Sequence, residues 1–292
     1  MFHTCVQWAG ALLYPPFCAV CGEPPVRGRH LCSGCAAGAA RVGGAVCRQC
    51  SRGAPGAVAL ESESAVTVAS GRLGASEPGL AGDSSPDSSP DLSPKGRLLP
   101  RCADCRARAP AFACAVAPYL AGGVVREVVH QFKYDGKRYL RRVLAGWMAA
   151  GLEDPRLKEE PPEVLVPVPL HWWKLRRRGF NQAEVLAREL ASIVAQAKSG
   201  DVAGYPMLAV TIGVEELLKR VRDTGTQTRL GRGERLENLR GAFAVRPRAR
   251  VRGRRILLVD DVLTTGATLD ACAEALLKDG AASVRALAVA RG

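Results

Sequence analysis

Two adjacent carboxylates followed by a short run of hydroxyl side chains could together bind a phosphorylated sugar. Asp260 and Asp261 come directly after an apolar run, and the five residues after Leu263 are Thr264, Thr265, Gly266, Ala267 and Thr268. Carboxylates accept hydrogen bonds from sugar hydroxyls. Hydroxyl side chains and backbone N–H groups at a glycine turn that opens a helix bind phosphate. The combination therefore predicts a site for a ribose 5-phosphate.

A buried strand and a helix are expected to position these groups. The apolar run Ile256–Val259 is typical of a strand buried on both faces of a parallel sheet, and Leu269–Lys278 has helical spacing that ends at Gly280. Ligands of open α/β sheets bind beyond the carboxyl ends of the strands. The loop is neither a Walker A motif nor a dinucleotide fingerprint. A plainer interpretation is an ordinary strand end whose second aspartate caps the helix.

The same segment resembles the phosphoribosyl-pyrophosphate signature of type I phosphoribosyltransferases: an apolar strand, an acidic pair and Thr-Thr-Gly-x-Thr. The resemblance implies that Asp260 and Asp261 hold the ribose hydroxyls and that residues 264–268 wrap the 5-phosphate. It also implies Mg²⁺ bridging pyrophosphate and sugar oxygens. No side chain stands out as a general base, so the catalytic residues are unassigned and enzymatic activity is left open.

A basic segment follows a second expected strand, Val164–Pro169, and precedes a helix expected at about 183–197. We interpret residues 171–182 as a loop in which clustered cations near Gly179 receive a pyrophosphate. The candidates are Lys174, Arg176 and Arg178. The alternative is a solvated basic turn with two tryptophans packed beneath it.

Eight cysteines form four Cys-x-x-Cys pairs, a spacing that turns two thiolates toward one point. We expect two structural zinc ions, one bound by Cys18, Cys21, Cys32 and Cys35 and the other by Cys47, Cys50, Cys102 and Cys105. A cross-braced pairing remains possible. Between the third and fourth pairs, residues from about 53 to 99 are rich in Ser, Gly and Pro and contain no aromatic residue, which predicts disorder.

These patterns divide the chain into a double zinc-ribbon module, 1–112, and a phosphoribosyltransferase-like domain, 113–292. The predicted fold class of the latter is α/β, with a parallel sheet flanked by helices. It opens with an expected strand, 113–120, and helices at 122–132 and 140–152. The net charge of +13 favours anionic partners. No stretch is apolar enough to span a membrane, and residues 1–14 make a poor signal peptide, so we expect a cytoplasmic protein.

Four features in the same order resemble the ComF competence family. They are the cysteine module, Pro-Val-Pro-Leu at 167–170, Arg-Arg-Gly-Phe-Asn-Gln at 177–182 and the final ribose-phosphate signature. A segment containing Arg222, Thr226 and Gln227 resembles the family's flexible loop, which would close over phosphoribosyl pyrophosphate; a disordered connector is the alternative. The resemblance implies phosphoribosyl transfer and a role in DNA uptake and natural transformation.

A second function class stays open at this point. The chain could be a non-catalytic competence factor that binds single-stranded DNA and uses the ribose-phosphate site as a sensor, or a scaffold for a helicase partner. Alternating arginines from Arg246 to Arg254 would form a basic ridge on extended backbone. The same ridge could instead be the solvated face of an edge strand.

Overall fold

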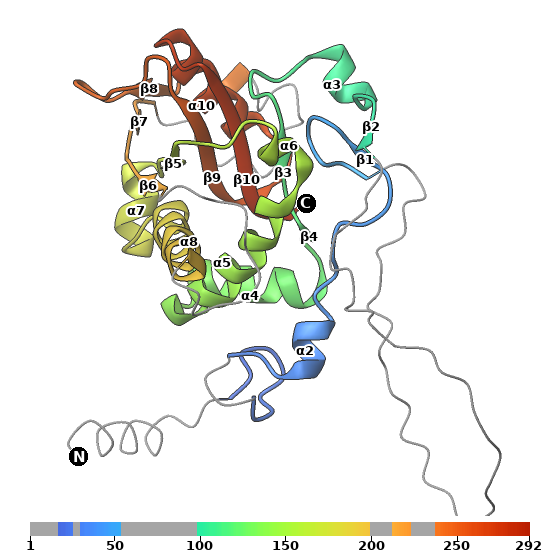
Figure 1. Ribbon diagram of the computed structural model, residues 1–292. Coiled ribbons are helices and arrows are strands. Elements are labelled where there is room, and N and C mark those ends of the chain that lie inside the picture. The colour runs from blue at the N-terminus through green and yellow to red at the C-terminus, as the bar shows by residue number, and fades with distance from the viewer. Residues whose placement is uncertain (1–16, 26–29, 54–97, 199–211, 223–236) are drawn as a thin grey trace, which may run out of the picture.

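The computed structural model describes residues 17–25, 30–53, 98–198, 212–222 and 237–292 (Figure 1). The centre of the molecule is a sheet whose strands run in the order β3-β10-β9-β5-β6, with β4 also paired to β10, and all pairings are parallel. These strands are Ala115–Val116 (β3), Tyr119–Leu120 (β4), Val164–Pro167 (β5), Gly213–Val214 (β6), Arg255–Leu263 (β9) and Ser283–Arg291 (β10).

Helices cover both faces of this sheet, as the two-sided burial of its central strands requires. On β9, Leu257 and Val259 pack toward α4, α5 and α8, whereas Ile256 and Leu258 pack toward α10 on the opposite face (Figure 1). The helices are α4 (Gly123–Tyr134), α5 (Arg141–Ala149), α6 (Pro155–Lys158), α7 (Trp172–Arg178), α8 (Gln182–Lys198) and α10 (Ala267–Lys278), with 3-10 turns η1 (Arg138–Leu140) and η2 (Ala150–Glu153). The predicted fold class is confirmed.

The expected elements occur near their predicted positions, with three differences. The strand expected at 113–120 is two short strands that follow one register along β10, interrupted at Ala117 and Pro118, where proline has no N–H to donate. The helix expected at 140–152 is α5 flanked by the two 3-10 turns. The segment expected as a basic loop, 171–182, contains α7, so the loop prediction is wrong there.

An antiparallel ribbon, β7 (Leu218–Arg220) with β8 (Phe243–Val245), precedes the segment in which the sequence predicts an arginine ridge. β8 ends before Arg246, and Arg248 has a positive φ of 66°, so the backbone is not extended through the alternating arginines. Arg246 pairs with Glu216, and Arg254 makes two 2.9 Å hydrogen bonds to Glu215. The basic ridge is therefore incorrect, since these side chains are partly neutralised and lie along a turn.

The cysteine module comprises α2 (Ser33–Ala37), β1 (Val46–Cys47), β2 (Leu98–Leu99) and α3 (Ala103–Ala107). The insertion predicted to be disordered from about 53 to 99 is structured at both ends. Gly53 forms a bridge to Val46, and β2 pairs with β1 in parallel. Residues 54–97, the rest of that prediction, lie outside the described residues, as does the amino-terminal stretch 1–16.

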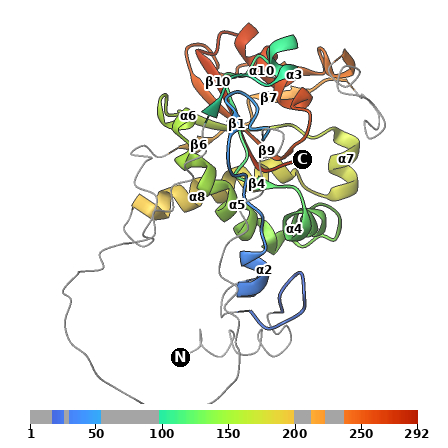
Figure 2. The same cartoon turned by 90° about the vertical axis from the view of Figure 1, so that its right-hand side faces the viewer.

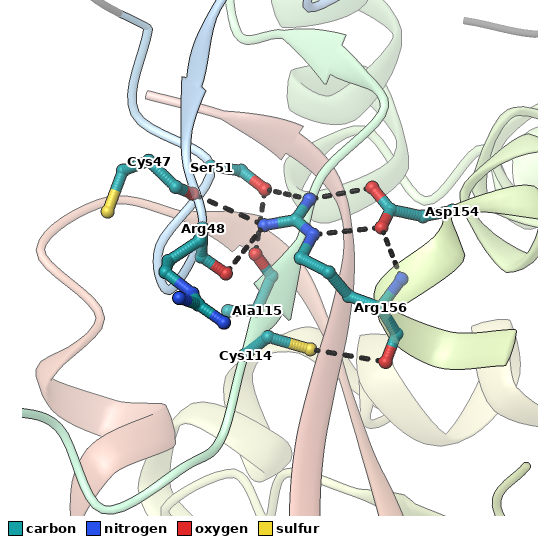
Figure 3. A network of polar contacts seen from close by, with 7 residues as sticks. All are labelled: Cys47, Arg48, Ser51, Cys114, Ala115, Asp154 and Arg156. Carbon is teal, nitrogen blue, oxygen red and sulfur yellow. Dashed lines mark hydrogen bonds and ion pairs between the residues drawn. The ribbon is translucent and has the colours of Figure 1, made fainter. Parts of the chain in front are cut away.

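Two separate contacts attach the cysteine module to the sheet domain. The first half packs beside α4, and the second half lies near β3, β10 and α10 (Figures 1 and 2). In the second contact the buried guanidinium of Arg156 donates to the backbone oxygens of Cys47 and Arg48, to Ser51 Oγ and to the carboxylate of Asp154 (Figure 3). The arginine of a salt bridge within the domain thus also donates hydrogen bonds to the backbone of a cysteine knuckle.

Candidate functional site

A cavity of about 480 Å³ opens where β5 and β9 end and brings the predicted sugar-binding and cation groups together. Its polar lining consists of two carboxylates, two threonines, one asparagine, one tyrosine and five cations: Asp260, Asp261, Thr264, Thr268, Asn181, Tyr134, Lys133, Lys174, Arg177, Arg178 and Arg220. This is the position at which ligands bind in open α/β sheets. Both carboxylates and two residues of the threonine loop, Thr264 and Thr268, therefore face one cavity.

Lys133, from the last turn of α4, forms an ion pair with the acidic couple. Its Nζ lies 2.8 Å from Asp261 Oδ1, and both side chains are largely buried, with 17% and 13% exposed. Burial on its own would lower the pKa of Lys133, but the charges of Asp261 and Asp260 raise it above its ordinary value. The lysine therefore stays charged and compensates one of the two carboxylates.

The second carboxylate, Asp260, is protonated in part near neutral pH. Burial, and then the charge of Asp261, raise the pKa of Asp260 to about 7, although its Oδ1 accepts a 2.8 Å hydrogen bond from Asp261 N. A divalent cation or a sugar hydroxyl would meet a singly or doubly ionised pair depending on pH. Two oxygen-bearing groups in one cavity are the donors that Mg²⁺ prefers.

We expect a pH dependence of stability that depends on Asp260. Between about pH 4 and pH 7 the folded protein keeps the proton on this carboxyl, whereas the unfolded chain, with an ordinary pKa of 3.8, has released it. Unfolding then releases a proton, so the free energy of unfolding decreases as pH rises through this window. Urea unfolding of the wild type and of Asp260→Asn at several pH values should show a difference that changes across the window. A constant difference would contradict the raised pKa.

The threonine loop has the backbone conformation that a phosphate cradle needs. Gly266, at the N-cap of α10, has φ of +80°, a region that side chains rarely adopt. Thr264 and Thr268 line the cavity. Thr265 and the buried Ala267 do not, because Thr265 Oγ1 accepts from Ala267 N within the turn. Arg291, from β10, fixes the start of the loop by donating to the carbonyl oxygens of Leu263, at 2.7 Å, and Thr264.

α7 presents a different set of cations from the one predicted. Lys174 and Arg178 line the cavity as expected, but Arg176 does not, and Arg177 takes its place. The prediction chose alternate residues, which share a side in extended backbone. On a helix, residues three and four positions apart share a face, so Lys174, Arg177 and Arg178 do so. His171 Nδ1 accepts from Trp173 N at the start of α7, and Gly179, with φ of 76°, ends it.

The predicted flexible loop is only partly described. Arg222 does not line the cavity, and its guanidinium donates to the backbone oxygens of Arg240 and Asn238. Arg220, two residues earlier on β7, lines it instead. Thr226 and Gln227 lie outside the described residues.

Lys133 and Tyr134 also line the cavity, and the sequence did not identify them as site residues. Arg178 donates to Tyr134 Oη at 3.1 Å, and its guanidinium lies over the tyrosine ring. A signal was present in the sequence, because Lys133-Tyr134-Asp135-Gly136-Lys137 ends a helix in the domain with polar residues and a glycine. Nothing local, however, indicates that this helix end contacts a strand more than 120 residues away.

The eight cysteines gather in two groups that follow the sequential pairing. Each group has all four sulfur atoms within 4.8 Å of one another: Cys18, Cys21, Cys32 and Cys35, and Cys47, Cys50, Cys102 and Cys105. The Sγ atoms of Cys21 and Cys32 are 3.6 Å apart, and those of Cys50 and Cys102 are 3.7 Å apart. Tetrahedral zinc with Zn–S bonds of about 2.3 Å requires sulfur atoms about 3.8 Å apart. Both groups therefore fit zinc, in closed sites of the structural kind.

The fold and the site define a phosphoribosyltransferase-like protein that carries a cysteine-rich ribbon module. Residues 175–292 match the family described as phosphoribosyl transferase domain, and residues 9–66 match the double zinc ribbon domain. No helix among the described residues combines the length and apolar character needed to cross a membrane.

Three curated relatives illustrate the resemblance. Competence protein F of Haemophilus influenzae is 30% identical over 56% of this chain and 66% of its own length. DNA utilization protein YhgH of Escherichia coli K12 is 32% identical over the same shares. Competence protein ComFC of Streptococcus pneumoniae is 26% identical over 57% of this chain and 63% of its own length. The alignments thus span just under two thirds of each relative.

The chain is thus similar to competence proteins of the ComF type, in agreement with its sequence motifs. Among solved structures, a glutamine phosphoribosylpyrophosphate amidotransferase from B. subtilis has a TM-score of 0.33 at 16% identity, over 54% of this chain and 30% of that one.

Proposed function

We propose that the cavity binds phosphoribosyl pyrophosphate together with Mg²⁺. The observation that carries the proposal is the meeting of an acidic pair, a glycine-hinged threonine loop and three cations of α7 around one cavity. Asp260 and Asp261 would accept hydrogen bonds from the ribose hydroxyls and bind the metal. The loop 264–268 and the N-terminus of α10 would bind the 5-phosphate, and Lys174, Arg177 and Arg178 would bind the pyrophosphate.

Transfer of the phosphoribosyl group is the reaction that this arrangement supports. As the bond between C1 and pyrophosphate breaks, negative charge grows on the departing oxygens and positive charge on the sugar. The α7 cations would stabilise the first charge, and the carboxylates the second. Mg²⁺, when bound, would neutralise further charge on the leaving group. Positioning and charge stabilisation would supply the catalysis, since no general base has been identified.

The biological role we propose is the handling of DNA during uptake and natural transformation, in the cytoplasm. The printed names of the relatives, competence protein and DNA utilization protein, support it. The same proposal includes two zinc ions in the cysteine groups and a boundary between module and domain near residue 112. It also includes a helicase partner.

A second candidate is a binder of single-stranded DNA that retains the sugar-phosphate site as a sensor. The observation in its favour is the exposure of Trp172 and Trp173, 65% and 51% exposed, on the helix that also carries the cavity cations. Exposed aromatic rings beside cations can stack on bases while the cations bind phosphates.

Calorimetric titration of the zinc-loaded protein distinguishes these candidates. We expect binding of phosphoribosyl pyrophosphate with Mg²⁺, weaker binding of ribose 5-phosphate, and an affinity at least about tenfold lower for Asp261→Asn, which removes a charged acceptor. Asp279→Asn, an exposed aspartate at the other end of α10, is the matched control and should bind normally. Failure of the wild type to bind the donor would reject the proposal.

The same titration with an oligonucleotide tests the alternative. Binding of single-stranded DNA with a steep salt dependence, unchanged in Asp261→Asn, would support the second candidate. Release of pyrophosphate from bound donor, lost in Asp261→Asn, would show that the site is an enzyme rather than a sensor.

A further inference from the structure

The second cysteine group contacts the threonine loop, residues 264–268 (hereafter the phosphate loop), through a three-residue segment, Pro110–Phe112. The link begins at Gln49, which lies between the knuckle cysteines Cys47 and Cys50 and is 3% exposed. Its Nε2 donates to the backbone oxygens of Pro110 and Phe112, both at 3.2 Å. A side chain of the knuckle is thus hydrogen-bonded to two carbonyl groups of the segment.

The same segment contacts the loop and its helix from below. A Cβ placed on Gly266 would lie 3.6 Å from the ring of Phe112, a side chain only 1% exposed, so this ring packs directly against the left-handed glycine. The backbone N–H of Ala111 donates to Asp270 Oδ1 at 2.6 Å, and Asp270 lies in the first turn of α10. The segment therefore contacts both the hinge of the loop and the helix whose N-terminus completes it.

We propose that the second cysteine group holds the phosphate loop in its binding conformation through Gln49 and residues 110–112, with Gln49 as a positioning residue. The inference rests on the proposed function in one respect, that the loop binds the 5-phosphate of a sugar. Closed around its metal, the knuckle fixes the direction of the Gln49 side chain, and the two hydrogen bonds then fix the segment on which Gly266 rests. A preorganised loop binds its ligand with less loss of conformational entropy.

The first cysteine group makes an analogous contact elsewhere, which supplies a control. Gln131 Nε2, from α4, donates to the backbone oxygen of Ala19 in the first knuckle at 2.7 Å. In both contacts one glutamine amide joins a knuckle to the domain, yet in the described part of the chain only the contact of Gln49 leads to the phosphate loop. Gln49→Leu and Gln131→Leu therefore each remove an amide that joins a knuckle to the domain, while every cysteine is kept. Gln131→Leu also removes side-chain hydrogen bonds with Glu127 and Lys137, so it is the more disruptive of the two at its own site.

Hydrogen exchange of the unliganded, zinc-loaded full-length protein tests the link directly. In Gln49→Leu we expect the amide of Ala111 and the first turn of α10 to exchange about tenfold faster, which corresponds to the loss of roughly one buried hydrogen bond's stability. Zinc content should match that of the wild type. In Gln131→Leu these amides should exchange at the wild-type rate. Equal rates in Gln49→Leu and wild type would overturn the proposal.

Affinity gives the functional readout. Titration with ribose 5-phosphate should show about tenfold weaker binding to Gln49→Leu than to the wild type at equal zinc content. If the wild type binds no ribose 5-phosphate, the proposed function fails. The exchange experiment still decides whether Gln49 and residues 110–112 hold the phosphate loop. If exchange accelerates in Gln49→Leu while its affinity stays unchanged, Gln49 stabilises residues 110–112 but does not position the loop for binding, and the proposal is wrong.

A second pair of variants covers the case in which Gln49→Leu does not fold. Asp270→Ala removes the acceptor of the Ala111 N–H, whereas Asp270→Asn keeps an oxygen in the same place. We expect faster exchange at Ala111 and weaker ribose 5-phosphate binding in the alanine variant, with both restored in the asparagine variant. Failure of the alanine variant to show either change would overturn the link between segment and helix.

Discussion

Replacing Arg156 with leucine should lower the free energy of unfolding by about 3–5 kcal/mol, the cost of breaking a buried ion pair by removing one partner. The Arg156 side chain is 8% exposed, and its Nε and Nη2 bond the two oxygens of Asp154 at 2.8 and 2.6 Å. Its remaining donors reach Ser51 Oγ at 2.9 Å and the backbone oxygens of Cys47 and Arg48 (Figure 3). A leucine would leave the Asp154 carboxylate, which is only 20% exposed, and these acceptors without their donor.

The effect should extend to the cysteine module, because Arg156 donates directly to the backbone of the Cys47 knuckle. Lys158→Ala, on the same helix α6, is the matched control. Lys158 forms an ion pair of 2.7 Å with Glu153, but both side chains are about a third exposed (35% and 27%), so the cost should be below about 1 kcal/mol. Denaturant unfolding at a fixed free zinc concentration measures both. A similar small loss for the two variants would show that the Arg156 network contributes no more than a surface pair.

The sequence was sufficient for the parts of the site that are built from neighbouring residues. The acidic pair, the threonine loop and Gly266 are contiguous, and their spacing between a buried strand and a helix predicts where they lie relative to each other. The cysteine pairs are also local, since each Cys-x-x-Cys turn directs two thiolates to one point. Their sequential grouping was expected and is the one in which the eight sulfur atoms gather.

Contacts between distant segments could not be predicted in the same way. Lys133 reaches Asp261 because the last turn of α4 lies beside the end of β9. Phe112 reaches Gly266 because β3 pairs with β10 beside β9. Arg156 is one of 41 lysines and arginines in the chain. It is buried because α6 packs against the Cys47 knuckle. Such roles depend on the order of strands, which local composition does not encode.

The basic segment 171–182 is expected as a loop from its composition, but the structure contains the helix α7 there. Its glycine and clustered cations favour a loop, but His171 caps a two-turn helix that Gly179 ends. The change from extended to helical backbone keeps Lys174 and Arg178 at the cavity and exchanges Arg176 for Arg177. That exchange yields the second prediction.

Arg177→Ala should weaken binding of phosphoribosyl pyrophosphate by about ten- to hundredfold, whereas Arg176→Ala should leave it nearly unchanged. A hydrogen bond to a charged group contributes about 1.5–3 kcal/mol, and each 1.4 kcal/mol is tenfold in affinity. The two arginines are adjacent in sequence, both exposed and both in the last turn of α7, so they share charge, helix propensity and long-range attraction for an anion. They differ in direction, because only Arg177 lines the cavity, with its guanidinium 5.5 Å from the centre of the Trp173 ring.

Calorimetric titration with Mg²⁺ present, at two salt concentrations, measures the difference between these variants. Screening weakens the long-range attraction that both arginines contribute, so an effect of direct contact should persist for Arg177→Ala at high salt. Ribose 5-phosphate should bind both variants like the wild type. It has no pyrophosphate, which is the group that we propose the α7 cations bind. Equal losses in the two variants would mean that α7 acts only through its summed charge, and the pyrophosphate would then have to be bound elsewhere.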